Sequence, residues 1–176
     1  MSHRPVVKRQ TGKSSQVTVP LAPVATTDAA SKDYVDRAGS MHCCVSRTGA
    51  YTVAAGPGYD VAIPWDTEDS DPFAMYDSGS STRITITEAG VYMVSARITF
   101  GSTSGAIMGV RIDKNGSFES VFFVDGLTVE TAAAVTKCVG PLSVGDYLEV
   151  LPYNGQGTAE GLTAGSARNN FAVYRI

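Results

Sequence analysis

The sequence predicts an all-β protein, a sandwich or jelly roll preceded by an extended arm and one short helix. From Met41 onward, apolar and polar residues alternate with a period of two, which is typical of half-buried antiparallel strands. Gly and Asn stand between the alternating runs, where tight turns need a positive φ. Eighteen glycines in 176 residues agree with many short strands joined by turns.

Three runs show the alternation most clearly. They cover residues 83–87, 91–100 and 147–151, with Ile, Val and aromatic residues on one face and Thr, Ser or Arg on the other. The pair Asn115-Gly116, between residues 110–113 and 118–122, is the strongest signal for a two-residue hairpin turn. The spacing of strands and turns predicts a β-sandwich or jelly roll.

Composition limits the classes of function. With 43% hydrophobic and 18% charged residues the chain is expected to fold, and its length suits one core domain. A formal net charge of -3 argues against a nucleic-acid partner, which would require a concentrated basic face. No run approaches the roughly 18 apolar residues of a membrane span, and no apolar segment follows the basic N-terminus as in a secretory signal. We therefore expect synthesis in a cytoplasm and no membrane insertion.

Residues 1–24 form a polar, proline-punctuated arm that cannot build a core. Its basic residues are Arg4, Lys8, Arg9 and Lys13. Such an arm either anchors to an acidic surface of a partner protein or stays a solvated tail, and the sequence leaves both readings open.

Residues 26–38 predict the one helix, which Thr27 or Asp28 can cap and Gly39 can end. A single apolar stripe runs along it, made of Ala30, Tyr34, Val35 and Ala38. A short helix with such a stripe needs a partner, either two further copies in a three-helix collar or the β domain of its own chain. The predicted organisation is an arm at 1–24, a helical collar at 25–40 and a jelly roll at 41–176.

The three cysteines, Cys43, Cys44 and Cys138, lack CxxC spacing. Adjacent strand residues point to opposite faces, so Cys43 and Cys44 are not expected to share a metal ion. We expect buried or half-buried reduced thiols.

The acidic stretch Asp66, Glu68, Asp69, Asp71 and Asp77 is a candidate site. Its oxygens could bind calcium at Asp66, Asp69 and Asp71, but the stretch lacks an EF-hand pattern and acidic loops often serve only solvation. Two of the carboxylates could also act as the acid and base of a glycosidase, although the chain offers little sequence for a sugar cleft. Because no nucleophile or phosphate-loop motif is present, we expect no catalytic residue, no cofactor and no enzymatic activity.

Aromatic residues and one glycine-rich stretch are further candidates for recognition. Trp65 is expected to pack in the core, whereas tyrosines could stack on glycans if exposed or otherwise join the core or a subunit interface. These are Tyr51, Tyr59, Tyr76 and Tyr153. Residues 154–166 predict a long loop which, with the turn at 101–105, could form a contact surface or remain uncommitted.

Several segments in order resemble the C1q/TNF-like jelly-roll family. They are AIPWD at 62–66, MYD at 75–77, the run 84–96, VRIDKNG at 110–116, LSVGDYLEV at 142–150 and NFAVYRI at 170–176. The resemblance covers about residues 41–176 and implies a ten-stranded jelly roll that forms homotrimers. From the apolar stripe of the helix and from this resemblance we predict the trimer-interface residues, which are Tyr34, Val35, Ala38, Tyr92, Tyr147, Phe171 and Tyr174.

Residues 24–36, VATTDAASKDYVD, are similar to a segment that recurs in tail-fibre and appendage proteins of tailed bacteriophages. Ser31 and Asp33 depart mildly from that pattern. The resemblance implies a structural protein on the virion surface, either a tail fibre, a minor tail protein or a head fibre, anchored to other virion proteins through the arm. Its jelly roll would attach to a host cell-surface glycan or protein. The alternative is a capsid decoration protein that clamps neighbouring shell subunits.

Overall fold

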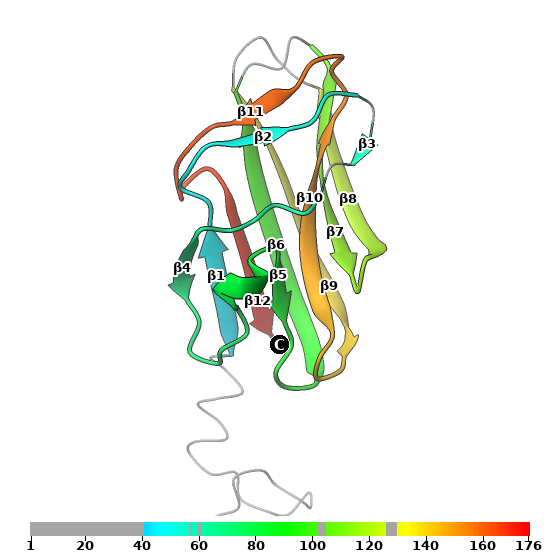
Figure 1. Ribbon diagram of the computed structural model, residues 1–176. Helices are drawn as coiled ribbons and strands as arrows, with labels where there is room; N and C mark the ends of the chain where they lie inside the picture. Colours follow the sequence, from blue (N-terminus) through cyan, green and yellow to red (C-terminus); the bar gives the residue numbers. More distant parts are fainter. Residues whose placement is uncertain (1–40, 57, 60, 102–104, 126–129) are drawn as a thin grey trace, which may run out of the picture. The chain divides into compact units, whose positions relative to one another are not determined.

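The computed structural model describes residues 41–56, 58–59, 61–101, 105–125 and 130–176. In this part of the chain twelve strands form two antiparallel sheets, and the only helical segment is one 3-10 turn, Ser78–Ser80 (Figure 1). The predicted all-β sandwich is confirmed. The arm at 1–24 and the collar at 25–40 lie outside the described residues, and within those residues no helix is long and apolar enough to cross a bilayer.

Seven strands form the larger sheet, here called sheet A. Their order is β2-β11-β6-β12-β1-β4, and β9 pairs with β6 as well. The strands are β1 (His42–Ser46), β2 (Tyr51–Val53), β4 (Thr67–Ser70), β6 (Gly90–Phe100), β9 (Thr131–Leu142), β11 (Glu160–Leu162) and β12 (Asn170–Arg175). The centre of this sheet is β6, which pairs along most of its length with both β9 and β12.

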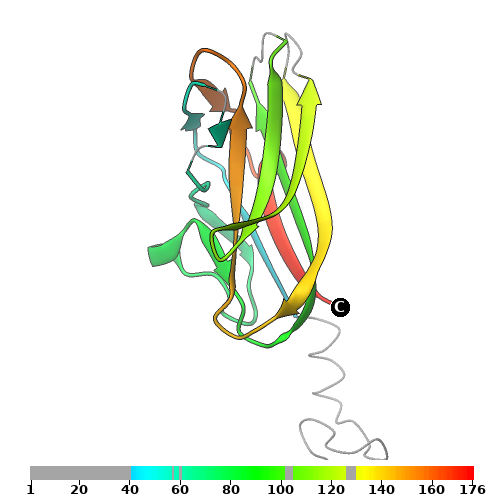
Figure 2. The same cartoon turned by 90° about the vertical axis from the view of Figure 1, so that its right-hand side faces the viewer.

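Five strands form the second sheet, sheet B, in the order β3-β10-β7-β8, with β5 also on β10. They are β3 (Gly58–Tyr59), β5 (Arg83–Thr85), β7 (Ile107–Lys114), β8 (Ser117–Asp125) and β10 (Tyr147–Asn154). In Figure 2, β8 and β9, yellow-green and yellow, run along the same edge of the sandwich, where the two sheets approach each other.

The hairpin between β7 and β8 turns where the sequence predicts it. Asn115 has φ 51° and Gly116 has φ 73°, the two consecutive positive values that a two-residue hairpin turn needs. The Asn115 side chain also donates to the Asp146 carboxylate (Nδ2 to Oδ1, 2.8 Å) and accepts from the Tyr147 backbone N–H. These bonds tie the turn to the connection before β10.

The core lies between the sheets and takes alternate residues from their strands. Trp65 is buried and stacks on Phe171, with ring centroids 5.8 Å apart, so the expected packing role of Trp65 is confirmed. Burial of such side chains is the main favourable term in folding. Other large core side chains are Tyr92, Phe100, Met41, Ile63, Met75, Ile84, Ile86, Ile98, Met108 and Ile112.

Two sequence expectations are corrected. Residues 154–166 do not form one long loop, because Glu160–Leu162 is strand β11 and pairs with β2. Asn154 is completely buried and donates to the carbonyls of Ala54 and Thr158, which fixes the start of this segment. The cysteines are all reduced, but Cys138 is exposed rather than buried, because it alternates outward on β9.

Candidate functional site

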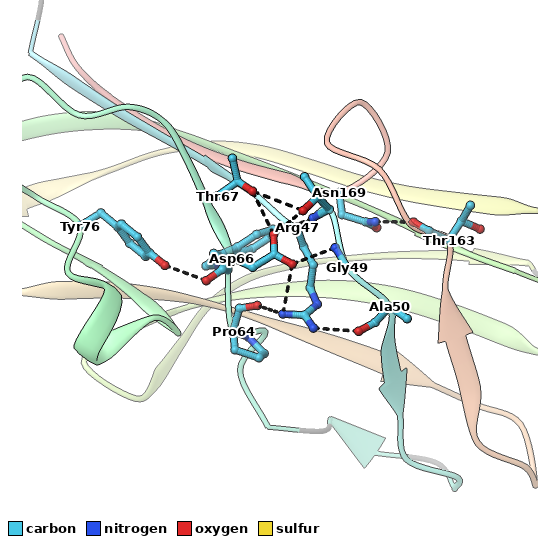
Figure 3. Close-up of polar contacts among 11 residues, drawn as sticks. Arg47, Gly49, Ala50, Pro64, Asp66, Thr67, Tyr76, Thr163 and Asn169 are labelled. Carbon is cyan, nitrogen blue, oxygen red and sulfur yellow. Dashed lines mark hydrogen bonds and ion pairs between the residues drawn. The ribbon is translucent and has the colours of Figure 1, made fainter.

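Asp66 is the most highly bonded residue of the acidic stretch (Figure 3). Its Oδ1 accepts from the backbone N–H and the hydroxyl of Thr48 (2.7 and 3.0 Å) and from the Thr67 hydroxyl (3.1 Å). Its Oδ2 accepts from the Gly49 N–H (2.8 Å) and lies 3.8 Å from the Arg47 guanidinium. Desolvation raises the pKa of Asp66, but the bonds from Thr48, Gly49 and Thr67 outweigh it and leave the pKa below its usual value.

This network holds a loop in place. Arg47 also donates to the backbone carbonyls of Pro64 and Ala50, and Tyr76 donates to the carbonyl of Trp65 (Figure 3). The carboxylate of Asp66 therefore joins the turn after β1 to the chain that enters β4. Its oxygens are occupied by donors from the protein, which leaves the group poorly suited to act as an acid or base on a substrate.

The other two residues of the predicted calcium site also bind the protein itself. Asp69 accepts from the Ser46 hydroxyl (3.0 Å), and Asp71 accepts from the Tyr76 backbone N–H (2.7 Å). In the part of the chain that the structure describes, no group of three or more His, Cys, Asp or Glu is placed to hold a metal ion. The geometry thus gives these carboxylates separate structural bonds rather than one shared ligand.

The second candidate is the side of sheet A that faces away from the core, here called the sheet-A face. Its side chains come from β1, β12, β6 and β9, and the strand register places them in rows. One row is His42, Tyr174, Met93 and Cys138, and the next is Cys44, Ala172, Ser95 and Thr136. Small and weakly polar residues thus cover these two rows, where a solvated sheet usually carries charges, and the following row adds one charge, Arg97 of β6.

Tyr174 is the largest ring of the sheet-A face. It stacks on His42, with centroids 5.9 Å apart, and its hydroxyl lies 3.3 Å from Cys44 Sγ. The bond with Cys44, together with burial, raises the pKa of Tyr174, so the hydroxyl is neutral at physiological pH. Tyr174 and Met93 each keep 37% of their surface exposed. Val91 and Ile176, joined by a backbone bond, add exposed apolar area beside them.

The edge formed by β8 and β9 is a third exposed surface. Phe122 pairs with Val110 on the core side of β8, yet it remains 45% exposed because β8 is the last strand of sheet B. Lys137 of β9 crosses to β8, where it binds the Glu119 carboxylate (2.8 Å) and backbone carbonyl (2.7 Å). The lysine satisfies one carbonyl of a strand edge, a common way to protect such edges.

The predicted interface residues separate into three groups. Tyr92 and Phe171 have no exposed surface and pack in the core, so they are corrected: the prediction assigned them to the wrong side of β6 and β12. Tyr147 lies on the outer side of sheet B, half-buried, with the Arg83 guanidinium 5.0 Å above its ring. Of the four predicted interface residues that the structure describes, Tyr174 is the one that lies on the sheet-A face. The remaining predicted residues, Tyr34, Val35, Ala38, Arg4, Lys8, Arg9 and Lys13, lie outside the described residues.

The residues that follow Tyr92 and Phe171 in sequence lie on the outer side of sheet A, where the prediction had placed the two rings. Met93 and Ala172 point outward because Tyr92, Val94, Phe171 and Val173 are buried and side chains alternate along a strand. The signal was present in the alternation, but only the position of the second sheet shows which of the two faces is the core.

Comparison with solved structures identifies the fold. The globular domain of the zebrafish complement 1qA protein superposes with a TM-score of 0.56 at 13% identity, covering 78% of this chain and 98% of that one. Murine APRIL at pH 5.0 gives 0.55 at 12% identity, with 77% and 99% covered. Eiger TNF from S. frugiperda gives 0.53 at 10% identity, with 77% and 92% covered. No protein-family profile and no curated protein sequence matches the chain.

These similarities define the class of the fold. The β domain is a C1q/TNF-like jelly roll, as the sequence resemblance implied, and it carries more strands than the ten that were expected. At such low identity the likeness shows the fold alone.

Proposed function

We propose that this protein is a homotrimeric, non-enzymatic virion protein of a tailed bacteriophage, a fibre or appendage whose jelly roll binds the host surface. The observation that carries the proposal is the sheet-A face, with Tyr174 and Met93 exposed among small residues. An exposed, weakly charged surface of this kind is typical of a protein-protein contact.

A closed ring of three copies needs two different surfaces that fit each other, because each copy touches one neighbour with one surface and the other neighbour with the second. The β8–β9 edge, with the exposed Phe122, can provide the second surface. Its protruding ring is complementary to the low relief that Ala172, Ser95 and Thr136 give to the sheet-A face. A C1q/TNF-like fold is consistent with self-association.

The place in the virion rests on the resemblance of residues 24–36 to phage appendage proteins. A role without catalysis is supported by the acidic stretch, because the carboxylates of Asp66, Asp69 and Asp71 accept bonds from the protein itself. In this proposal the arm at 1–24 binds other virion proteins. Binding strength comes from avidity, since three weak contacts on one rigid head reinforce one another.

Light scattering on the full chain tests the proposal. We expect a mass of three chains for the natural sequence and of one chain for Ala172→Arg, because this substitution puts a charge at the centre of the sheet-A face. The matched control is Val144→Arg, which adds the same charge at an exposed apolar side chain in the turn before β10. A single-chain mass for the natural sequence, or an unchanged trimer in Ala172→Arg, would contradict the proposed contact.

The location in the virion has a separate test. Mass spectrometry of purified phage particles should detect this chain, and a variant that lacks residues 1–24 should keep its mass in solution but be absent from particles. Particles that incorporate the shortened chain normally would exclude the arm as the anchor.

A further inference from the structure

The outer side of sheet B, which faces away from the core, carries an exposed aromatic pair. Phe123 of β8 and Tyr153 of β10 lie on either side of Gly109 of β7 in one cross-strand row. Their ring centroids are 5.1 Å apart at 83°, an edge-to-face contact across the glycine. Phe123 keeps 46% of its surface exposed, so one aromatic ring is presented to solvent in a fixed orientation.

Gly109 is what allows this arrangement. A Cβ at position 109 would lie 2.7 Å from Phe123 Cδ1, closer than such atoms approach, and 3.0 Å from the Phe122 carbonyl oxygen, which is a tight contact. Any other residue would push the Phe123 ring away from Tyr153. A glycine in a strand interior weakens the strand and often marks a close approach, and here it is the ring of Phe123 that approaches.

Polar groups lie further along the same strands on the same side of the sheet. Arg83, Glu149 and Asp113 form one row across β5, β10 and β7, and Arg111 stands between this row and the aromatic pair. Arg111 binds Asp113, which is only 2% exposed and has one carboxylate oxygen without a hydrogen-bond partner. The charged row at Asp113 lies four residues along β7 from the aromatic row at Gly109, about 13 Å at strand spacing.

We infer that this outer face of sheet B binds a neutral saccharide, which stacks on Phe123 of the edge strand β8. The inference rests on the proposed role in host-surface binding and names the class of ligand. A sugar ring presents apolar C–H groups on one side and hydroxyls around its rim. One ring can therefore cover Phe123 while its hydroxyls reach Arg111, and the next sugar of an oligosaccharide can reach Glu149.

The charges favour an uncharged ligand. Charges of both signs lie on this side of the sheet. The bases are Arg83 and Arg111, and the acids are Asp113, Glu149 and Asp125, the last of these one row beyond the aromatic pair. Arg111 already neutralises Asp113, which is 2% exposed, so an ion would meet no concentrated charge of the opposite sign. An anionic polymer would meet Glu149 and Asp125, and a cationic one both guanidinium groups. A neutral, hydroxyl-rich ligand can use Arg83, Arg111 and Glu149 as donors and acceptors.

Saturation-transfer NMR on the full chain tests this inference with three neutral hexasaccharides as probes, maltohexaose, cellohexaose and chitohexaose. We expect at least one of them to bind, and Phe123→Ala to weaken it about tenfold or more, because the contact of one exposed aromatic side chain is lost. Gly109→Ala should weaken binding similarly, since it moves the ring without removing it.

The matched control is Phe122→Ala, an equally exposed ring next in sequence but on the other side of β8. Saccharide binding should survive in Phe122→Ala even if its trimer is weakened. It should also survive in Ala172→Arg, so the trimer contact and the saccharide site can fail independently of each other. If none of the three saccharides binds, if only an anionic polysaccharide such as heparin binds, or if Phe122→Ala and Phe123→Ala lose binding equally, the inference is overturned.

Discussion

At the scale of single residues, the acidic stretch shows how a chemically suggestive cluster can have a structural role. A sequence places Asp66, Asp69 and Asp71 close together but does not show what each carboxylate accepts. The structure gives Asp66 backbone and hydroxyl donors from the turn after β1, so its charge is compensated locally. Hydrogen bonds to an ionised group are among the stronger ones, which makes this residue a stabilising element of the fold.

Replacing Asp66 by Ala should lower the free energy of unfolding by about 1–3 kcal/mol, the usual cost when a charged hydrogen-bond acceptor is lost. Urea denaturation followed by circular dichroism measures this change. Glu68→Gln, an exposed position in the same stretch, serves as the control and should have little effect. Calcium should not change the midpoint of the natural protein; an increase with calcium that disappears in Asp66→Ala would restore the metal-site hypothesis.

Asp146 provides a prediction on pH. Bonds from the Ser143 N–H and from Asn115, with Lys114 3.2 Å away, lower its pKa from 3.8 to about 2. Because the folded pKa lies below the unfolded one, the ionised group adds stability above about pH 4, and this contribution is lost as the pH falls from 4 to 2.

Asp146→Asn should therefore be less stable than the natural protein at pH 7, with a difference that shrinks as the pH approaches 2. Thermal unfolding at a series of pH values measures it. The control is Asp125→Asn at an exposed strand end. A difference between Asp146→Asn and the natural chain that stays constant from pH 7 to pH 2 would show that the carboxylate charge is not responsible.

At the scale of elements, the β7–β8 hairpin depends on its turn. Gly116 has φ 73°, and the nearest atom to a Cβ added there would be Tyr147 Oη at 3.7 Å, so space is available and only the backbone conformation opposes a side chain. Gly116→Ala should cost about 1–2 kcal/mol of stability. Gly157→Ala, at an open position whose φ is not in the positive range, should cost much less. Equal losses in the two variants would mean that the turn is not under this constraint.

The elements that sequence predicted well are those with a strong local signal. The runs at 83–87, 91–100 and 147–151 correspond to β5, β6 and β10, and Asn115-Gly116 turns the hairpin. By contrast, β9 was not singled out, because alanine at 132–134 is a poor strand former. Its extended conformation is stabilised by ten paired positions on β6, a long-range interaction that local pattern does not reveal.

The candidate surfaces were harder to predict than the strands. Alternation shows that Tyr92 and Met93 point to opposite sides, but it does not show which side the second sheet covers. Tyr92 looked like an interface residue because it is aromatic, and it is buried for the same reason. Phe123 lies one residue beyond the predicted run 118–122, and its contact with Tyr153 depends on Gly109 in a neighbouring strand, which only the pairing of β7 and β8 brings beside it.

At the scale of the whole molecule, association and stability should be coupled. If the sheet-A face is buried between copies only in the assembled state, unfolding must also separate the copies, and the equilibrium depends on protein concentration. The Tm of the natural chain should therefore rise with concentration, whereas the Tm of Ala172→Arg should be lower and independent of it. Differential scanning calorimetry over a hundredfold range of concentration measures both.

Val144→Arg is the control for charge in this experiment, because it leaves the sheet-A face intact and should keep the concentration dependence of the natural chain. The calorimetric result separates two reasons for loss of the trimer in Ala172→Arg. A folded monomer with a sharp, concentration-independent transition means that the substitution blocks only the contact. A broad or absent transition means that the β domain needs its neighbours in order to fold, and a Tm of the natural chain that is constant with concentration would argue against association through this face.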